Sequence, residues 1–152
     1  MKQRRPSRRH ALPLGTATLA ALLAGAVAAQ DAAISVRAGE HPGYTRVVID
    51  APAGTRFAWG VEGRRLVLGL PGNAATLDTA PAEAARGLSR ISGFSGGRLL
   101  EIAMSCDCGA RAMQLADGRV VLDLTEAAPR PAIPGALTEA EPAPPEAPEA
   151  AS

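Results

Sequence analysis

The chain has few of the residues that supply catalytic chemistry. Between Gln30 and Leu124 it holds one His, two Cys and no Lys, and only four of its 152 residues are aromatic. A Ser-His-Asp triad, a catalytic Lys and a multi-His zinc site would each lack parts. No pair of acids is grouped in one loop for general acid and base catalysis. We therefore predict that the protein is not an enzyme and needs no cofactor or metal.

The middle of the chain also lacks an excess of either charge. Ten Arg balance ten Asp and Glu between Gln30 and Leu124, whereas the first nine residues carry five cations and the last 28 carry five Glu and one Arg. Nucleic-acid binding needs clustered positive charge that displaces counterions from phosphate. The balance therefore excludes nucleic acid as a partner.

Long hydrophobic runs are absent apart from one near the start. Residues 12–27 are uncharged, follow a basic stretch and lead into the small residues Ala28 and Ala29. This order is typical of a secretory signal, and the run is shorter than the roughly 20 residues that span a bilayer. We expect residues 1–29 to be cleaved on export to the periplasm, leaving no membrane span. The general secretory route is favoured, although residues 7–12 resemble a twin-arginine motif.

The C-terminal segment has little apolar surface to bury. From Thr125 onward, 21 of 28 residues are Pro, Ala or Glu and none is aromatic. Such a composition does not offset the entropy of ordering the chain. Its prolines favour extended conformations. We predict a disordered tail over residues 126–152, which is either without function or a tether or docking peptide.

The region from Ala33 to Leu124 has the hydrophobic pattern of β-strands. Apolar residues recur at every second position in short runs, and Asp117-Gly118 is a strong hairpin signal. One stretch, residues 79–86, looks helical, with Pro81 suited to its first turn and Gly87 to its end. The predicted strands are residues 34–37, 44–50, 55–61, 65–70, 88–92, 99–105, 111–115 and 119–124.

The two halves of this region are similar in sequence. At an offset of 55, residues 56–63 align with 111–118, and after one deletion residues 65–70 align with 119–124. Neither half could bury both faces of its strands alone. We predict an all-β fold, a small two-sheet β-sandwich of two pseudo-symmetric halves, with at most one short helix near residues 80–86. Phe57 and Trp59 are predicted to lie in its core.

Three stretches resemble an AMIN-type domain: residues 34–37 with 44–50, residues 63–72, and residues 118–124. Such domains precede the catalytic part of periplasmic N-acetylmuramoyl-alanine amidases and occur in outer-membrane secretins. The resemblance covers about residues 33–124, within an AMIN-like domain bounded at 30–125. It implies two symmetrically packed sheets and a role in binding the cell wall or localising a larger machine.

Cys106 and Cys108 are the only cysteines. An oxidising compartment and an even count favour a disulfide, although partners two residues apart close too short a loop to stabilise much. A redox pair, a soft-metal site with His41 as third ligand, and an intermolecular bridge are the alternatives.

Five residues are candidates for ligand binding: Arg37, His41, Tyr44, Arg46 and Arg56. Guanidinium groups bind carboxylates in a bidentate manner, and an aromatic ring can pack on a sugar. The simpler interpretation is a solvated sheet face and turn. We expect an exported binding or localisation module for peptidoglycan or for an envelope protein docked by strand addition. The alternative is a CxC-based redox or soft-metal-handling periplasmic protein.

Overall fold

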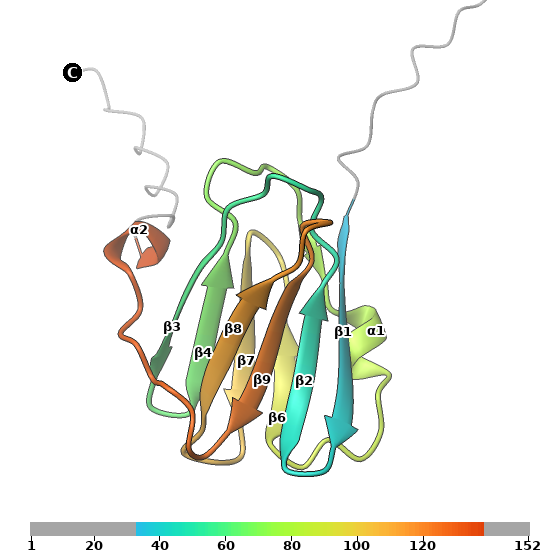
Figure 1. The fold of residues 1–152 in the computed structure, drawn as a ribbon, viewed down its shortest axis with the longest axis vertical. Helices are drawn as coiled ribbons and strands as arrows, with labels where there is room; N and C mark the ends of the chain where they lie inside the picture. Colours follow the sequence, from blue (N-terminus) through green and yellow to red (C-terminus); the bar gives the residue numbers. More distant parts are fainter. Residues whose placement is uncertain (1–32, 139–152) are drawn as a thin grey trace, which may run out of the picture.

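The computed structural model describes residues 33–138, which form a sandwich of two β-sheets (Figure 1). The elements are β1 (Ile34–His41), β2 (Tyr44–Ile49), β3 (Ala58–Glu62), β4 (Arg65–Gly69), β5 (Leu77–Asp78), α1 (Ala80–Glu83), β6 (Ile91–Ser95), β7 (Leu99–Met104), β8 (Gly109–Gln114), β9 (Val120–Thr125) and α2 (Gly135–Thr138). One sheet, the front sheet of Figure 1, has the order β5-β1-β2-β9-β8, and the rear sheet has the order β3-β4-β7-β6. The predicted all-β, two-sheet sandwich is confirmed.

Each of the eight predicted strands is present, with ends that differ by a few residues. The two-residue strand β5 was not expected. The predicted helix shrinks to the single turn of α1, which begins where the Asp78 carboxylate accepts a hydrogen bond from the Ala80 amide. A second short helix, α2, exceeds the one helix that was predicted. No helix in residues 33–138 is long and apolar enough to cross a membrane.

The strand order supports two pseudo-symmetric halves. If β1 to β4 are exchanged with β6 to β9 in both directions, the order β1-β2-β9-β8 becomes β6-β7-β4-β3. This is the order of the other sheet. At the offset of 55, β2 falls on β7. However, neither half forms a sheet of its own, because each contributes one hairpin to each sheet. The antiparallel pairs β2-β9 and β4-β7 join the two halves.

The core between the sheets is aliphatic. Inward-pointing residues of the central strands are fully buried, and the largest of them are Val36, Val47, Ile49, Leu66, Leu68, Leu100, Ile102, Leu122 and Leu124. Phe57 and Trp59, which were predicted to be core residues, are partly buried and pack against the margin of this cluster. The alternation of apolar and polar residues along each strand determines which face of its sheet is buried.

Residues 126–138, which we call the strap, run along the side of the sandwich where β3 and β8 are edge strands (Figure 1). The Ala110 amide donates a hydrogen bond to the Pro129 carbonyl (3.0 Å), and the Val61 amide donates one to the Pro131 carbonyl (2.7 Å). Leu137 at the end of the strap is buried. The prediction that disorder begins at residue 126 is therefore wrong as far as residue 138.

The strap is ordered by backbone contacts that its composition does not reveal. Proline cannot donate a hydrogen bond but accepts one normally, so Pro129 and Pro131 pair with edge amides that would otherwise lack partners. The predicted signal peptide, residues 1–29, and the rest of the predicted tail, residues 139–152, lie outside the described residues.

Candidate functional site

The outer face of the front sheet brings together four of the five predicted ligand-binding residues. In the antiparallel register of β1 and β2, His41 lies opposite Tyr44 and Gly39 lies opposite Arg46. Arg37 shares this face, since it is two residues from Gly39. We call Arg37, His41, Tyr44 and Arg46 the tyrosine patch. Arg56 lies apart, in the loop between β2 and β3, where it lines a separate depression.

The aromatic rings of the tyrosine patch are fixed by contacts within the protein. The His41 ring stacks on the Tyr44 ring, with centroids 4.9 Å apart and planes 9° from parallel. The Arg46 guanidinium carbon lies over the Tyr44 ring, 5.3 Å from its centroid, within range for a cation–π contact. The patch is therefore preorganised.

Both arginines of the tyrosine patch are paired with acids of neighbouring strands or turns. Arg46 donates two hydrogen bonds to Asp123 on β9 (2.7 and 2.9 Å), and Arg37 donates two to Asp50 after β2 (both 2.8 Å). The bonds to these acids raise the pKa of both guanidinium groups. They use Nε and one Nη2 hydrogen, so the Nη1 group of each arginine is left for a ligand.

A depression of about 200 Å³ lies within the tyrosine patch. Its lining is formed by Arg37, Ala38, Gly39, His41, Arg46 and Val48. A Cβ atom added to Gly39 would meet only the His41 Nε2 atom, at 3.9 Å. The absence of a side chain at Gly39 therefore keeps this part of the surface open.

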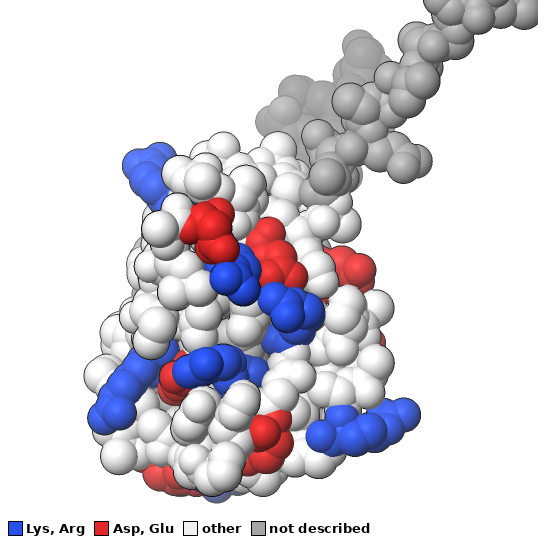
Figure 2. Space-filling model, turned by 45° about the vertical axis from the view of Figure 1, so that its right-hand side comes forward, with Lys and Arg blue, Asp and Glu red and all other residues white. Residues whose placement is uncertain are grey.

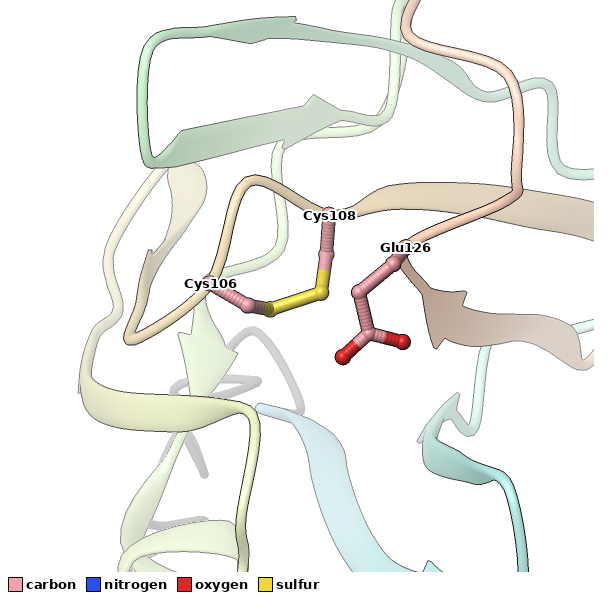
Figure 3. Close-up of side chains that lie close together, drawn as sticks. All are labelled: Cys106, Cys108 and Glu126. Carbon is pink, nitrogen blue, oxygen red and sulfur yellow. A yellow bond between two sulfur atoms is a disulfide. The ribbon is translucent and has the colours of Figure 1, made fainter.

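A second feature of chemical interest lies where β7 of the rear sheet leads into β8 of the front sheet. Cys106 and Cys108 form a disulfide there, as predicted, and we call residues 106–108 the disulfide turn. Cys108 is fully buried, whereas Cys106 is partly exposed. The side chain of Glu126 turns toward the two sulfur atoms (Figure 3), and a carboxylate oxygen lies within 4.8 Å of both.

The possible third metal ligand beside the two cysteines is the carboxylate of Glu126. His41, which was considered for that role, lies in the tyrosine patch. The β8-β9 register pairs Gly109 with Thr125, and one step further along the same hairpin Cys108 comes opposite Glu126. A two-residue Asp117-Gly118 turn would have placed Gly109 opposite Glu126, whereas the observed pairing of Gln114 with Val120 shifts the register by one residue. Glu126 was not considered as a neighbour of Cys108 because the chain after Thr125 was interpreted as a disordered tail.

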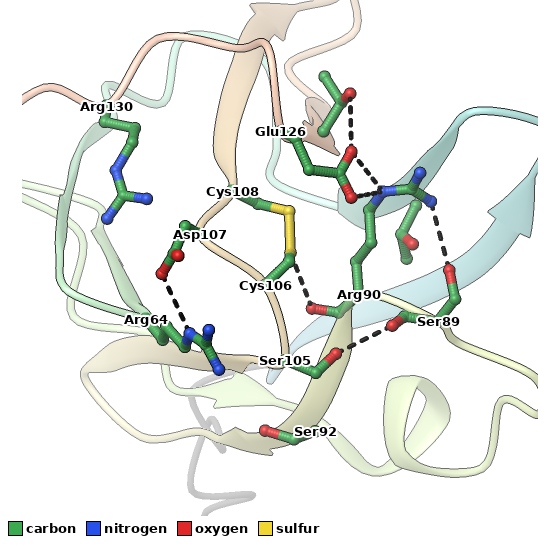
Figure 4. Close-up of a disulfide and its surroundings, with 12 residues drawn as sticks. Arg64, Ser89, Arg90, Ser92, Ser105, Cys106, Asp107, Cys108, Glu126 and Arg130 are labelled. Carbon is green, nitrogen blue, oxygen red and sulfur yellow. Dashed lines mark hydrogen bonds and ion pairs between the residues drawn. A yellow bond between two sulfur atoms is a disulfide. The ribbon is translucent and has the colours of Figure 1, made fainter.

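Arg90 links the disulfide turn to the end of β1. Its side chain is 16% exposed and lies within ion-pair distance of Glu40 (3.1 Å). It also lies within ion-pair distance of Glu126 (3.4 Å; Figure 4). Glu40 also accepts hydrogen bonds from the buried Thr45 hydroxyl (2.6 Å) and from the Ser89 amide and hydroxyl (3.1 and 2.7 Å).

The acids of this cluster are held in their charged forms. Burial acts to raise the pKa of Glu40, but the hydrogen bonds from Thr45 and Ser89 and the charge of Arg90 together lower it. The backbone amide of Glu126 lowers the pKa of that carboxyl, with further help from Arg90. A hydrogen bond from Arg64 lowers the pKa of Asp107. Basic side chains lie beside acidic ones over the middle of the face shown in Figure 2.

The disulfide turn is held in place by more than its disulfide. The Ser105 amide donates to the Arg90 carbonyl (3.1 Å), and the Ser105 hydroxyl donates to the Ser89 carbonyl (2.9 Å). The Met104 amide donates to the Arg64 carbonyl (2.8 Å). A loop of three residues gains only about 1.5 kcal/mol from closure in the chain-entropy model. The fold therefore depends little on the bond.

No family model, curated protein or solved structure matches this chain. The resemblance to AMIN-type domains therefore rests on the sequence stretches given above.

Proposed function

We propose that the protein is a binding module that holds a cell-wall glycan, with peptidoglycan as first choice, on the tyrosine patch. The observation that carries this proposal is the convergence of Arg37, His41 and Arg46 around an open depression, with the Tyr44 ring stacked on His41 beside it. The predicted export signal and the resemblance to AMIN-type domains favour a ligand of the cell envelope.

The charge balance of the patch favours a ligand rich in hydroxyl groups over a strongly anionic one. Asp50 and Asp123 offset the charges of Arg37 and Arg46, so the patch offers oriented N–H donors with little net charge. Val48 in the lining and the stacked ring of His41 add apolar surface suited to the C–H face of a sugar. An apolar lining with a few placed polar groups is typical of ligand sites.

The position of the patch suits a module that reaches toward a polymer. Figure 1 shows that β1 begins, and α2 lies, at one end of the sandwich, whereas the turn between β1 and β2 lies at the other. His41 and Tyr44 flank that turn. A ligand on this end of the patch would therefore contact the domain away from the points where the chain enters and leaves it.

An envelope protein docked by strand addition is the second candidate partner. The strap already contacts the β3 and β8 edges through Val61 and Ala110. An added strand would have to displace the strap before it could pair there. We therefore place the glycan first.

Cosedimentation with purified peptidoglycan sacculi tests the proposed function. The purified protein should sediment with the sacculi, and Gly39→Val, which fills the depression, should weaken binding on the order of tenfold, about 1.4 kcal/mol. Gly93→Val on β6 is the matched control, since a Cβ at Gly93 meets nothing within 4 Å. It should bind like the wild type.

The salt dependence of sedimentation distinguishes the ligand chemistry. Because the arginines are already paired, binding should change little between about 0.05 and about 0.5 M salt, a range over which screening of exposed charges becomes strong. Protein that stays in the supernatant at low salt would overturn the proposed function. Equal binding by the Gly39 and Gly93 variants would exclude the tyrosine patch as the site.

A further inference from the structure

We propose that the Cys106–Cys108 disulfide is a thiol–disulfide exchange site that oxidises a dithiol, and that Cys106 is the sulfur under attack. This activity is independent of the tyrosine patch. It develops the redox alternative that the two cysteines raise in the sequence, and it assigns a separate role to each sulfur.

The two sulfur atoms differ in access. An attacking thiolate approaches a disulfide sulfur from the side opposite the sulfur that leaves. Cys108 is fully buried, so a partner cannot reach it in the folded protein, whereas Cys106 is partly exposed at the surface of the turn. The geometry therefore assigns Cys106 as the attacked atom and Cys108 as the leaving group.

The exchange balances as two successive displacements. A partner thiolate bonds to the Cys106 Sγ atom, the Sγ–Sγ bond breaks, and its electron pair leaves on Cys108, which takes up a proton. The second partner thiolate then bonds to the partner sulfur, and the electron pair of the mixed disulfide leaves on Cys106, which takes up the second proton. The partner dithiol is oxidised to a disulfide, and Cys106 and Cys108 are reduced to thiols.

The surroundings of the turn accommodate the reduced state. The Cys106 Sγ atom lies 3.7 Å from the Arg90 carbonyl oxygen, which could accept a hydrogen bond from a Cys106 thiol. The Ser105 backbone and hydroxyl bonds do not involve either sulfur (Figure 4). Reduction can therefore occur without loss of the fold.

Glu126 controls how easily a thiolate approaches. Its carboxylate lies within 4.8 Å of both sulfur atoms and is only partly offset by Arg90. The repulsion between two like charges about 5 Å apart in water is enough to slow a reaction about fourfold. Glu126 is thus a positioning residue that acts through its charge, and it slows the attack by a partner thiolate.

The direct test is partial reduction of the folded protein with glutathione, followed by alkylation and fragment mass spectrometry. The expected product carries glutathione on Cys106 and the alkyl group on Cys108. Glutathione on Cys108 would overturn the assignment. A disulfide that resists glutathione and dithiothreitol until urea unfolds the chain would overturn the exchange site altogether.

A charge variant separates this role from a merely structural one. Glu126→Gln should raise the rate of reduction by glutathione about fourfold at low salt, and the gain should shrink as salt is added. Glu62→Gln removes the same charge from an exposed side chain on β3 and should leave the rate unchanged. Equal rates for the wild type and Glu126→Gln would remove Glu126 from the mechanism.

Discussion

Gly60 and Gly109 lie where the strap crosses the edge strands. A Cβ atom at Gly60 would overlap the backbone of Ala132 and Ile133, and one at Gly109 would overlap the carbonyl groups of Ala128 and Pro129. Backbone has little freedom to move aside, unlike the end of a flexible side chain. These two glycines therefore admit the strap because they lack side chains.

We expect Gly60→Ala to lower the free energy of unfolding by about 1–3 kcal/mol, because the added methyl group overpacks the contact between β3 and the strap. Gly93→Ala, which adds the same atom on β6 where nothing lies within 4 Å, should cost little. Urea unfolding of the two variants and the wild type measures the difference. Equal losses would show that the strap does not press on Gly60.

The sequence predicts the sheet face of some residues but not the side chains that they contact. The period-two pattern correctly puts Arg37 and Arg46 on one face of two strands. Their partners Asp50 and Asp123 were not predicted, because Asp123 is 77 positions from Arg46 and meets it only through the β2-β9 pairing. Arg90 and Glu40 were missed for the same reason, since their contact spans 50 positions.

The strap occupies the two edge strands at one side of the sandwich, where another chain could otherwise pair. Exposed edge strands are templates for association with other chains, and the strap occupies β3 through Val61 and β8 through Ala110. On the opposite side, α1 packs against β1 and buries Ala82. Each side of the sandwich is thus covered by a short segment outside the main strands.

We expect a chain that ends at Thr125 to be less stable and to associate in a concentration-dependent manner, because the edge amides lose their partners and the surface under Leu137 is exposed. A chain that ends at Thr138 keeps the strap and is the matched control. Light scattering coupled to size exclusion measures the mass of each. A monomeric chain ending at Thr125 would contradict the protective role of the strap.

The strands could be predicted because alternation is a local signal, whereas their partners could not. Residues 44–50 and 119–124 each indicate a strand, but nothing within either says that β2 and β9 lie side by side. The internal repeat came closest, since a two-fold arrangement of hairpins reproduces both sheet orders. The strap was misjudged because its order comes from hydrogen bonds to edge strands rather than from its own hydrophobic residues.

Ion pairs that join distant segments make the stability of the domain sensitive to acid. The pKa of Glu101 is lowered by its hydrogen bond with Arg65, and that of Glu40 by Thr45, Ser89 and Arg90 in spite of burial. A carboxyl whose pKa is lower in the folded state contributes stability above its unfolded pKa, about 4.3 for Glu. That contribution is lost as the pH falls through the folded pKa.

We expect the urea midpoint to fall as the pH is lowered below about 4.3. Glu40→Gln should be less stable than the wild type at pH 7, because the amide cannot replace the charge beside Arg90 or accept every bond made by Ser89 and Thr45. The gap between the two should narrow in acid. Parallel profiles would show that Glu40 contributes no pH-dependent stability.

The chain enters and leaves the sandwich at the same end, which has a mechanical consequence. β1 begins and α2 lies at the same end of the sandwich (Figure 1). If the two ends of the domain are pulled apart, the load strips β1 from β2 and the strap from β3 starting at that end, so hydrogen bonds break one after another instead of sharing the force. The domain should therefore yield at low tension when stretched between its ends, while a pull applied at the turn between β1 and β2 would act along the strands and meet greater resistance.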